Sequence, residues 1–374
     1  MHTHVIGAPD HTFTPAEEKR PPRPLHAWRR AIAGLCLLAT AAGCEASPVL
    51  RVLAWPGYAP PEVIQSFEKQ TGAKVELSVT TTDEVLWARV NAHDGADFDV
   101  FAVNTAELQR YAAANLIRPI ILDEIPNRRH QLPAFRNVEA IAGLTRRAAS
   151  GPETLGVPYT FSAMGLIYDR RQFPVPPTSI AALWDPRFRG KVIAYNAGAH
   201  AFSLAAQSLG LASPFRIPDA LLPQAVDRLI ALRRNALGFY TRPQESVDLF
   251  MRHHAALMFA NYGSQQVRLL EEAGADVGYL FPREGALAWL DCWVITRAAR
   301  DPALAHAWID HLLAREASAL LVSREGLANT VSDSAASGDK RHLLWLEPVE
   351  APARRETLWA RIYSGDRAER VLAP

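Results

Sequence analysis

The stretch Val49–Gly72, VLRVLAWPGYAPPEVIQSFEKQTG, decides the fold class. Its first part, VLRVLAW, is a mainly apolar run of the kind found in strands that are buried on both faces. Pro56 and Gly57 end this strand, and Pro61 opens an amphipathic helix. A buried strand followed closely by such a helix is the first unit of an α/β protein.

Strands and helices continue to alternate after this unit. In AKVELSVT the residues Val75, Leu77 and Val79 alternate with other residues and share one side, which predicts a second strand. A helix is predicted over 83–90, with its apolar side chains facing inward; these are Val85, Leu86 and Val90. DFDVFAV is another buried strand, and Thr105 can cap the helix after it.

The same alternation recurs after residue 156. Strands are predicted in LGVPYTFSAMGLIYD and GKVIAYN, and helices in HAFSLAAQSLG and PQAVDRLIALRR. Short joints between such elements indicate mainly parallel sheets covered by helices on both faces. The chain is too long for one ordinary core, and no low-complexity linker divides it. We therefore expect two α/β lobes joined by short strand-like hinge segments.

The N-terminus has the features of a secretory signal. Two arginines precede AIAGLCLLATAA, an apolar run of 12 residues, and small residues lead into Cys44. The run is shorter than the ~18 apolar residues that suggest a membrane span. AAGC resembles a bacterial lipobox, although Ala41 stands where leucine is usual. Residues 1–43 are thus predicted to be a signal peptide of the lipoprotein type, with lipid on Cys44 and the protein in the periplasm; a soluble periplasmic protein or a twin-arginine signal are the alternatives.

Composition excludes several other classes of protein. With Cys36 removed and Cys44 lipidated, Cys292 is the one thiol left, so no internal disulfide is expected. The net charge is +1 without a basic stripe, which argues against nucleic acid as a partner. The sequence has no P-loop, GxSxG or HExxH motif, and adjacent His253 and His254 do not form a metal pair. We expect no enzyme activity, cofactor or metal.

Two aromatic residues mark a candidate site at the end of the first strand. Trp55 and Tyr58 flank the Pro-Gly turn. In open α/β sheets, ligands bind beyond the carboxyl ends of the strands. The two rings therefore either line a ligand cleft or simply cover the end of the sheet.

Six motifs in order and spacing resemble the periplasmic polyamine-binding proteins of ABC importers, the spermidine/putrescine-binding family. The resemblance runs from about Leu50 to about Thr330. The motifs are LAWPGYAPPEVIQSFEKQTG, ADFDVFAVNTAELQRYAAANLI, LGVPYTFSAMGLIYD, IAALWDPRFRGKV, FPREGALAWLDCWVI and SREGLANT. The resemblance implies the two-lobed periplasmic-binding-protein fold, with two mainly parallel sheets joined by hinge strands and the ligand in the cleft between the lobes.

Hinge crossings are then expected near 157–159, 281–282 and 327–328. Lobe one would comprise 49–156 plus 283–326, and lobe two 157–282 plus 327–374. Ligand that bridges the lobes shifts the population toward a closed form.

The resemblance also implies roles for single residues. Trp55 and Tyr58 would hold an alkylamine, since a cation over an aromatic face gains ~0.5–2 kcal/mol. Trp289 would stack on the ligand, and Asp291 would pair with an ammonium group. The full set of predicted ligand-binding residues is Trp55, Tyr58, Asn104, Asn196, His200, Asn261, Tyr262, Trp289 and Asp291.

Departures from the family pattern concern the negative charges. Acids that the family carries are missing at Pro56 or Gly57, in the run from Asn196 to His200, and in the patch from Phe259 to Tyr262; Leu327 stands where the family has a late tyrosine. Each buried ammonium needs an acceptor or carboxylate. Two explanations stay open: acids come from elsewhere, such as Asp83 or Glu84, or the ligand has one cationic end and a neutral or anionic remainder.

The sequence therefore predicts the substrate-binding component of an ABC importer, a monomer that binds a small organic amine and docks on an inner-membrane permease. A polyamine is the leading ligand class. The alternatives are another cationic or zwitterionic solute, a ligand sensor of the same fold, and, less favoured, a periplasmic enzyme.

Overall fold

The computed structural model describes residues 47–149, 151–332 and 343–373. The predicted signal peptide and the lipidated Cys44 lie outside the described residues. Within the described part, no helix is long and apolar enough to cross a membrane.

Lobe one is built on a sheet that begins with the strand identified first in the sequence. Strands β1 (Val49–Ala54), β2 (Lys74–Val79) and β3 (Val100–Asn104) pair in parallel in the order β2-β1-β3, as predicted. Strand β12 (Ala286–Thr296) then runs antiparallel to β3. The helices of this part are α1 (Pro61–Thr71), α2 (Asp83–Asn91), α3 (Thr105–Ala113), α4 (Pro133–Arg136), α9 (Pro302–Leu312) and α10 (Arg315–Glu325).

Lobe two repeats the arrangement on a second group of strands. β8 (Val192–Tyr195), β9 (Ala236–Tyr240) and β10 (Leu257–Ala260) are parallel to one another. β11 (Val277–Leu280) pairs with β7 (Val157–Asp169). The helices are α5 (Gly198–Ser208), α6 (Leu222–Asn235), α7 (Pro243–Arg252), α8 (Ser264–Glu272), α11 (Pro352–Ser364) and α12 (Ala368–Val371).

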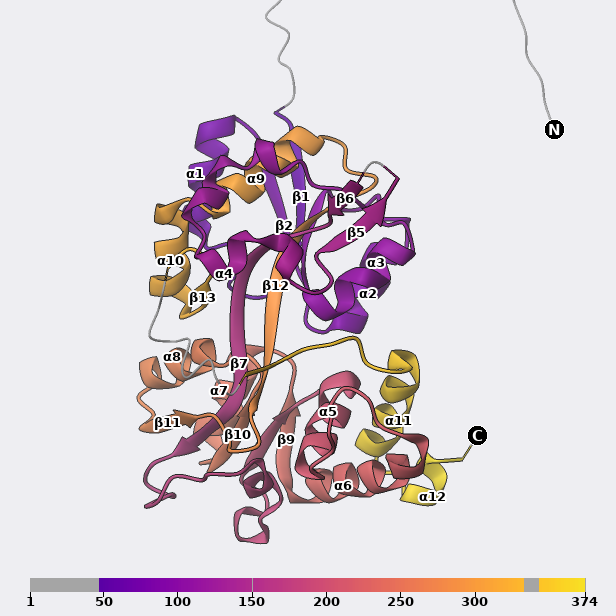
Figure 1. The fold of residues 1–374 in the computed structure, drawn as a ribbon. Helices are drawn as coiled ribbons and strands as arrows, with labels where there is room; N and C mark the ends of the chain where they lie inside the picture. Colours follow the sequence, from indigo (N-terminus) through magenta and orange to yellow (C-terminus); the bar gives the residue numbers. More distant parts are fainter. Residues whose placement is uncertain (1–46, 150, 333–342, 374) are drawn as a thin grey trace, which may run out of the picture. The chain divides into compact units, whose positions relative to one another are not determined.

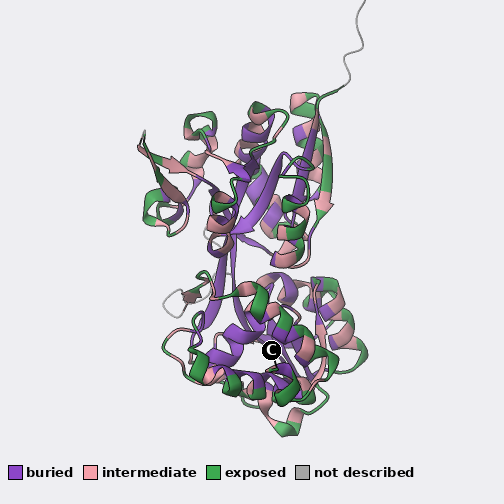
Figure 2. Cartoon of the chain, turned by 90° about the vertical axis from the view of Figure 1, so that its right-hand side faces the viewer, coloured by how far each residue is buried: buried purple, intermediate pink, exposed green. Residues whose placement is uncertain are grey.

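Two long strands join these groups (Figure 1). The first part of β7 pairs with β12, whereas its last residues pair with β10 and β11. Twelve of the described strands therefore form one curled sheet, whose main path is β2-β1-β3-β12-β7-β10-β8-β9. Figure 2 shows that these central strands are buried and that exposed residues lie mainly on the helices and loops around them. The two-lobed α/β fold is confirmed.

Short elements complete the chain. β4 (Ile117–Arg118) pairs with β12, β13 (Ala328–Asn329) with β7 and β14 (Leu343–Trp345) with β12, while β5 (Thr145–Ala148) and β6 (Gly151–Thr154) form a hairpin. 3-10 turns lie at Leu122–Glu124, Pro126–His130, Val138–Ala140, Ile180–Trp184, Pro186–Phe188 and Asp219–Leu221. The predicted lobe boundaries stay predictions.

Two local expectations were wrong. Asn104, not Thr105, caps α3, because its side-chain oxygen accepts hydrogen bonds from two N–H groups of the first turn. Leu77 and Val79 lie in β2 as predicted, and they are 37% and 48% exposed on this edge strand. Val85 is also 41% exposed, whereas Leu86 and Val90 are buried as predicted.

Candidate ligand-binding site

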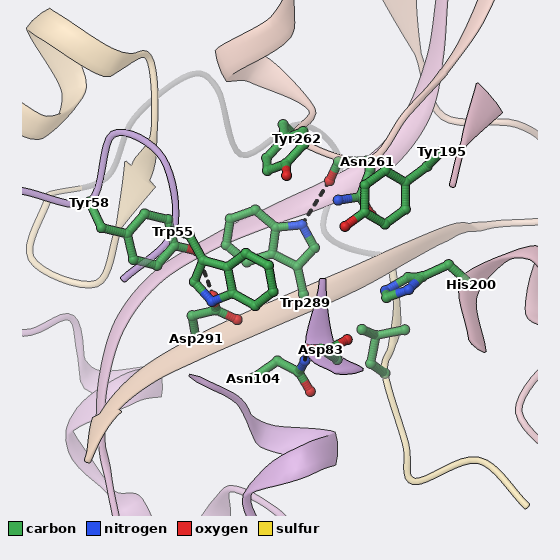
Figure 3. Close-up of a pocket in the computed structure, with 11 residues that line it drawn as sticks. Trp55, Tyr58, Asp83, Asn104, Tyr195, His200, Asn261, Tyr262, Trp289 and Asp291 are labelled. Atoms are coloured by element: carbon green, nitrogen blue, oxygen red, sulfur yellow. Dashed lines mark hydrogen bonds between the residues drawn. The ribbon is translucent and has the colours of Figure 1, made fainter. Parts of the chain in front are cut away.

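A pocket lies where β1, β3, β8 and β10 end beside β12 (Figure 3). It encloses about 360 Å³ of empty space, part of it open to solvent. Eight of the nine predicted residues line it, together with Asp83, Tyr195 and Leu346: Trp55, Tyr58, Asn104, His200, Asn261, Tyr262, Trp289 and Asp291. Asn196 does not line it; its side-chain oxygen instead accepts a hydrogen bond from the indole N–H of Trp359 on α11.

Tyr58 and Asp291 form the first wall of the pocket. The Tyr58 hydroxyl donates a hydrogen bond to Oδ2 of Asp291 at 2.6 Å. Its ring lies 6.4 Å, centroid to centroid, from that of Trp289. The backbone oxygen of Tyr58 accepts a hydrogen bond from the Tyr159 hydroxyl at 2.8 Å, which fixes the turn after β1.

Gly57 allows this turn to lie close to Gln265 and Glu325. Its φ of 83° lies in the left-handed region, and a Cβ there would sit 2.5 Å from Nε2 of Gln265 and 2.6 Å from Oε2 of Glu325. The same Gln265 amide donates to the backbone oxygen of Pro56 at 3.3 Å. Trp55 follows β1 directly, and its buried indole N–H has no partner among the described residues.

Asp83 and Asn104 line the pocket next to each other. The Nδ2 of Asn104 donates to Oδ1 of Asp83 at 2.9 Å. Because the Asn104 oxygen is used to cap α3, its amide has one orientation available. Asn104 also lies directly opposite Asp291 in the β3–β12 ladder, so Asp83 is held close to the second carboxylate. Of the two acids considered from the sequence, Asp83 reaches the pocket, and Glu84 is not among its lining residues.

Lobe two supplies the facing wall from the ends of its strands. Tyr195 ends β8, and its hydroxyl donates across the pocket to the backbone oxygen of Thr81 at 2.8 Å. Asn261 follows β10; its backbone oxygen accepts the Trp289 indole N–H at 2.8 Å, while its side-chain Oδ1 is buried without a partner among the described residues. Tyr262 donates to the backbone oxygen of Thr241 at 2.6 Å.

Tyr195 and Leu346 were missed by the sequence analysis. Tyr195 carries the signal that identified Trp55, an aromatic residue at the carboxyl end of a strand, and could have been found in the same way. Leu346 lies in the C-terminal stretch, where no sequence pattern pointed to a site.

The pocket is electrostatically unbalanced. Burial raises the pKa of Asp291 to about 7, and the hydrogen bond from Tyr58 offsets only part of that rise. Burial, with repulsion from Glu107, Glu84 and Asp291, also raises the pKa of Asp83. No lysine or arginine is among the described lining residues.

His200 does not balance this charge. Burial, and then the nearby Arg355 guanidinium, lowers the pKa of His200 to about 4, so the imidazole is neutral at neutral pH. Its Nδ1 is buried without a partner in the described part of the chain. The site therefore offers a cation two carboxylates, a neutral imidazole and several aromatic faces.

The cysteine and the histidine pair singled out in the sequence do not contribute to the pocket. Cys292 is a buried free thiol, and His253 and His254 are exposed. Within the described residues, no group of three His, Cys, Asp or Glu side chains could hold a metal ion.

Known proteins resemble this chain in sequence and in fold. Spermidine/putrescine-binding periplasmic protein 1 of Haemophilus influenzae is 26% identical over 277 residues, which cover 74% of this chain and 73% of the relative. A norspermidine sensor of Vibrio cholerae is 23% identical over 278 residues, 72% of each chain. The structure titled a putative spermidine/putrescine ABC transporter from Listeria monocytogenes aligns with a TM-score of 0.72 at 21% identity, covering 85% of this chain and 98% of that one.

The family comparison covers most of the chain. The model described as bacterial extracellular solute-binding protein matches residues 62–343, which include all of the residues that line the pocket except Trp55, Tyr58 and Leu346. The chain belongs to the bacterial extracellular solute-binding protein family.

Proposed function

We propose that the protein is the periplasmic substrate-binding component of an ABC importer and that it binds a small organic amine, with a linear polyamine as the leading class. The names of its relatives support this assignment, since several are spermidine/putrescine-binding periplasmic proteins. They also support a binding rather than an enzymatic role.

The observation that carries the proposal is the buried, uncompensated carboxylate of Asp291. It is 4% exposed, and its hydrogen-bond partner in the described structure is a neutral phenol. A buried carboxylate is costly unless a cation meets it. An ammonium group in the pocket would supply that cation, and Asp83 would meet a second one.

The aromatic residues suit the rest of such a ligand. Methylene chains pack against the faces of Trp55, Tyr58 and Trp289, and an ammonium over an aromatic face gains ~0.5–2 kcal/mol. The neutral imidazole of His200 and the free oxygen of Asn261 can each accept a hydrogen bond from an ammonium group. No lining group repels a cation.

Closure of the lobes follows from where these residues lie. The first strands and β12 carry Trp55 and Asp291, whereas Asn261 and Tyr262 follow β10 on the other side. A ligand that touches both sets favours the closed arrangement, which the permease would recognise. A lipid on Cys44, after removal of residues 1–43, would tether this monomer to the membrane near its permease.

One observation favours a second candidate ligand class. The buried indole N–H of Trp55 needs an acceptor, and a fully protonated polyamine has none. An amine that also carries a carbonyl or carboxylate would satisfy it. The norspermidine sensor among the relatives likewise makes a sensing role an alternative to transport, because both use the same closure.

A thermal-shift and calorimetric screen tests the proposal. We expect putrescine and spermidine to stabilise the protein, since a ligand at 100 times its Kd adds about 2.7 kcal/mol to the free energy of unfolding. The screen includes choline and 4-aminobutanoate as a monocation and a zwitterion. A response to either of these without any response to putrescine or spermidine would replace the polyamine by the second class, and no response to any amine would overturn the proposal.

A further inference from the structure

A second cavity adjoins the ligand pocket and shares one wall with it. The shared residues are Asp83, Asn104, His200 and Leu346. The second cavity encloses about 270 Å³ of empty space, also partly open. On its far side it is lined by Glu107 of α3, Ser203 of α5 and Glu347, among others.

The second cavity also carries an acidic side chain, Glu107, which is paired with Arg110 at 3.4 Å. Burial raises the pKa of Glu107, although Arg110 one turn away offsets part of the rise. The unpartnered Nδ1 of His200 belongs to a side chain that is only 8% exposed and lines both cavities. In Figure 3 the imidazole of His200 is directed into the space beside Asp83 and Asn104. The negative and acceptor groups therefore continue beyond the first pocket.

Leu346 is the one apolar residue in the shared wall. It follows β14, and its backbone N–H donates to the carbonyl of Ala288 on β12 at 2.8 Å. Since Ala288 directly precedes Trp289, this bond fixes Leu346 beside the aromatic part of the pocket. An apolar side chain fixed between two acidic cavities gives an ammonium group no partner at that point.

We propose that Leu346 is a specificity-determining residue that divides one amine-binding channel into two. The inner part, between Asp291 and Asp83, takes a ligand with two ammonium groups. The outer part, at Glu107, would serve a third ammonium group but is closed off by Leu346. This inference rests on the proposed function and adds to it a preference for diamines over triamines.

Calorimetry with putrescine and spermidine on the wild type and Leu346→Ala tests the inference. The wild type is expected to bind putrescine more tightly than spermidine. In Leu346→Ala the spermidine-to-putrescine affinity ratio should rise by about tenfold, the equivalent of one charge-assisted hydrogen bond. Adding Glu107→Gln to Leu346→Ala should remove most of that gain.

Two further variants keep the test decisive. Leu344→Ala removes a half-buried leucine of the same strand that lines neither cavity, and it should leave the ratio unchanged. Leu346→Val makes a smaller hole and should move the ratio in the same direction if the alanine variant does not fold. Tighter wild-type binding of spermidine, or an unchanged ratio in the Leu346 variants, would overturn the inference while leaving the proposed function intact. A wild type that binds neither amine would overturn the inference and the polyamine class, and the proposed function as a whole falls only if choline and 4-aminobutanoate also fail to bind.

Discussion

Two buried aspartates in the sheet of lobe one have opposite surroundings. Asp99, just before β3, is 1% exposed and accepts hydrogen bonds from the Arg51 side chain at 2.6 and 3.0 Å and from the backbone N–H groups of Arg51 and Arg300 at 2.8 Å each. Asp291, on β12, is 4% exposed and accepts one from the Tyr58 phenol.

The pKa values follow these surroundings. Burial alone would raise the pKa of Asp99, yet the Arg51 and backbone hydrogen bonds lower it below its usual value. Burial raises the pKa of Asp291 to about 7 because the phenol compensates little of the charge. Asp99 thus has a cationic partner within the protein, whereas Asp291 has none among the described residues and, in the proposed function, meets the cation of the ligand.

Asp99→Asn should have the largest effect and should act on stability. Breaking a buried ion pair by removing one partner costs about 3–5 kcal/mol, because Arg51 is left unpaired. Chemical denaturation of the variant would measure this loss, and its affinity for putrescine should be unchanged. Since the pKa of Asp99 is lowered by folding, its contribution is present at neutral pH and is lost as pH falls through the folded value. A variant as stable as the wild type would contradict the claim that Asp99, unlike Asp291, stabilises the fold through its own ion pair.

Asp291→Asn should weaken ligand binding without destabilising the fold. Affinity for putrescine should fall by about 100-fold, since the ammonium loses its charged partner. The unliganded protein should become more stable, by on the order of 4 kcal/mol above pH 7, because an uncompensated buried charge is removed. The sign follows from the raised pKa: the carboxylate costs stability increasingly as pH rises from its unfolded pKa to about 7.

Asp99→Asn is the matched control for this variant, since both remove one buried carboxylate from the same sheet. Calorimetry and thermal melting on the two proteins separate binding from folding. If Asp291→Asn melts far below the wild type while its affinity is unchanged, Asp291 is a structural residue.

Trp55→Ala should have the smallest effect. Loss of one cation–π contact of ~0.5–2 kcal/mol corresponds to a roughly 3- to 30-fold weaker affinity for putrescine. Trp55→Phe keeps an aromatic face and should recover most of the affinity while it removes the unpartnered N–H. Calorimetric titration of both variants gives the comparison; equal affinities for alanine, phenylalanine and tryptophan at this position would mean that Trp55 only covers the end of the sheet.

The sequence predicted the fold well because its signals are local. The apolar run of β1, the Pro-Gly turn and the helix start at Pro61 all lie within a few residues of one another, and the structure places α1 and β1 there. The errors were also local. Asn104 and Thr105 are adjacent cap-forming residues, and apolar spacing alone does not show that Val85 is 41% exposed.

The candidate site was predictable only where a strand end or a family motif marked it. Trp55 and Asp291 carried such marks. The position of Asp83 depends on Asn104, which uses its oxygen to cap α3 and its amide to hold the carboxylate. Leu346 reaches the pocket because β14 pairs with β12, more than fifty residues away in sequence, and no periodicity encodes that contact.

Proton release on binding tests the central claim most directly. An alkylamine has a pKa of ~10.4, like that of lysine, and is therefore protonated at pH 7. Asp291, whose pKa is about 7, must lose its proton to pair with the ammonium group. We expect the enthalpy of putrescine binding at pH 6–7 to depend on the ionisation enthalpy of the buffer. Affinity should rise by up to about tenfold per pH unit below pH 7 and level off above it. Binding that is independent of pH and releases no protons would contradict the claim that an uncompensated carboxylate receives the ligand.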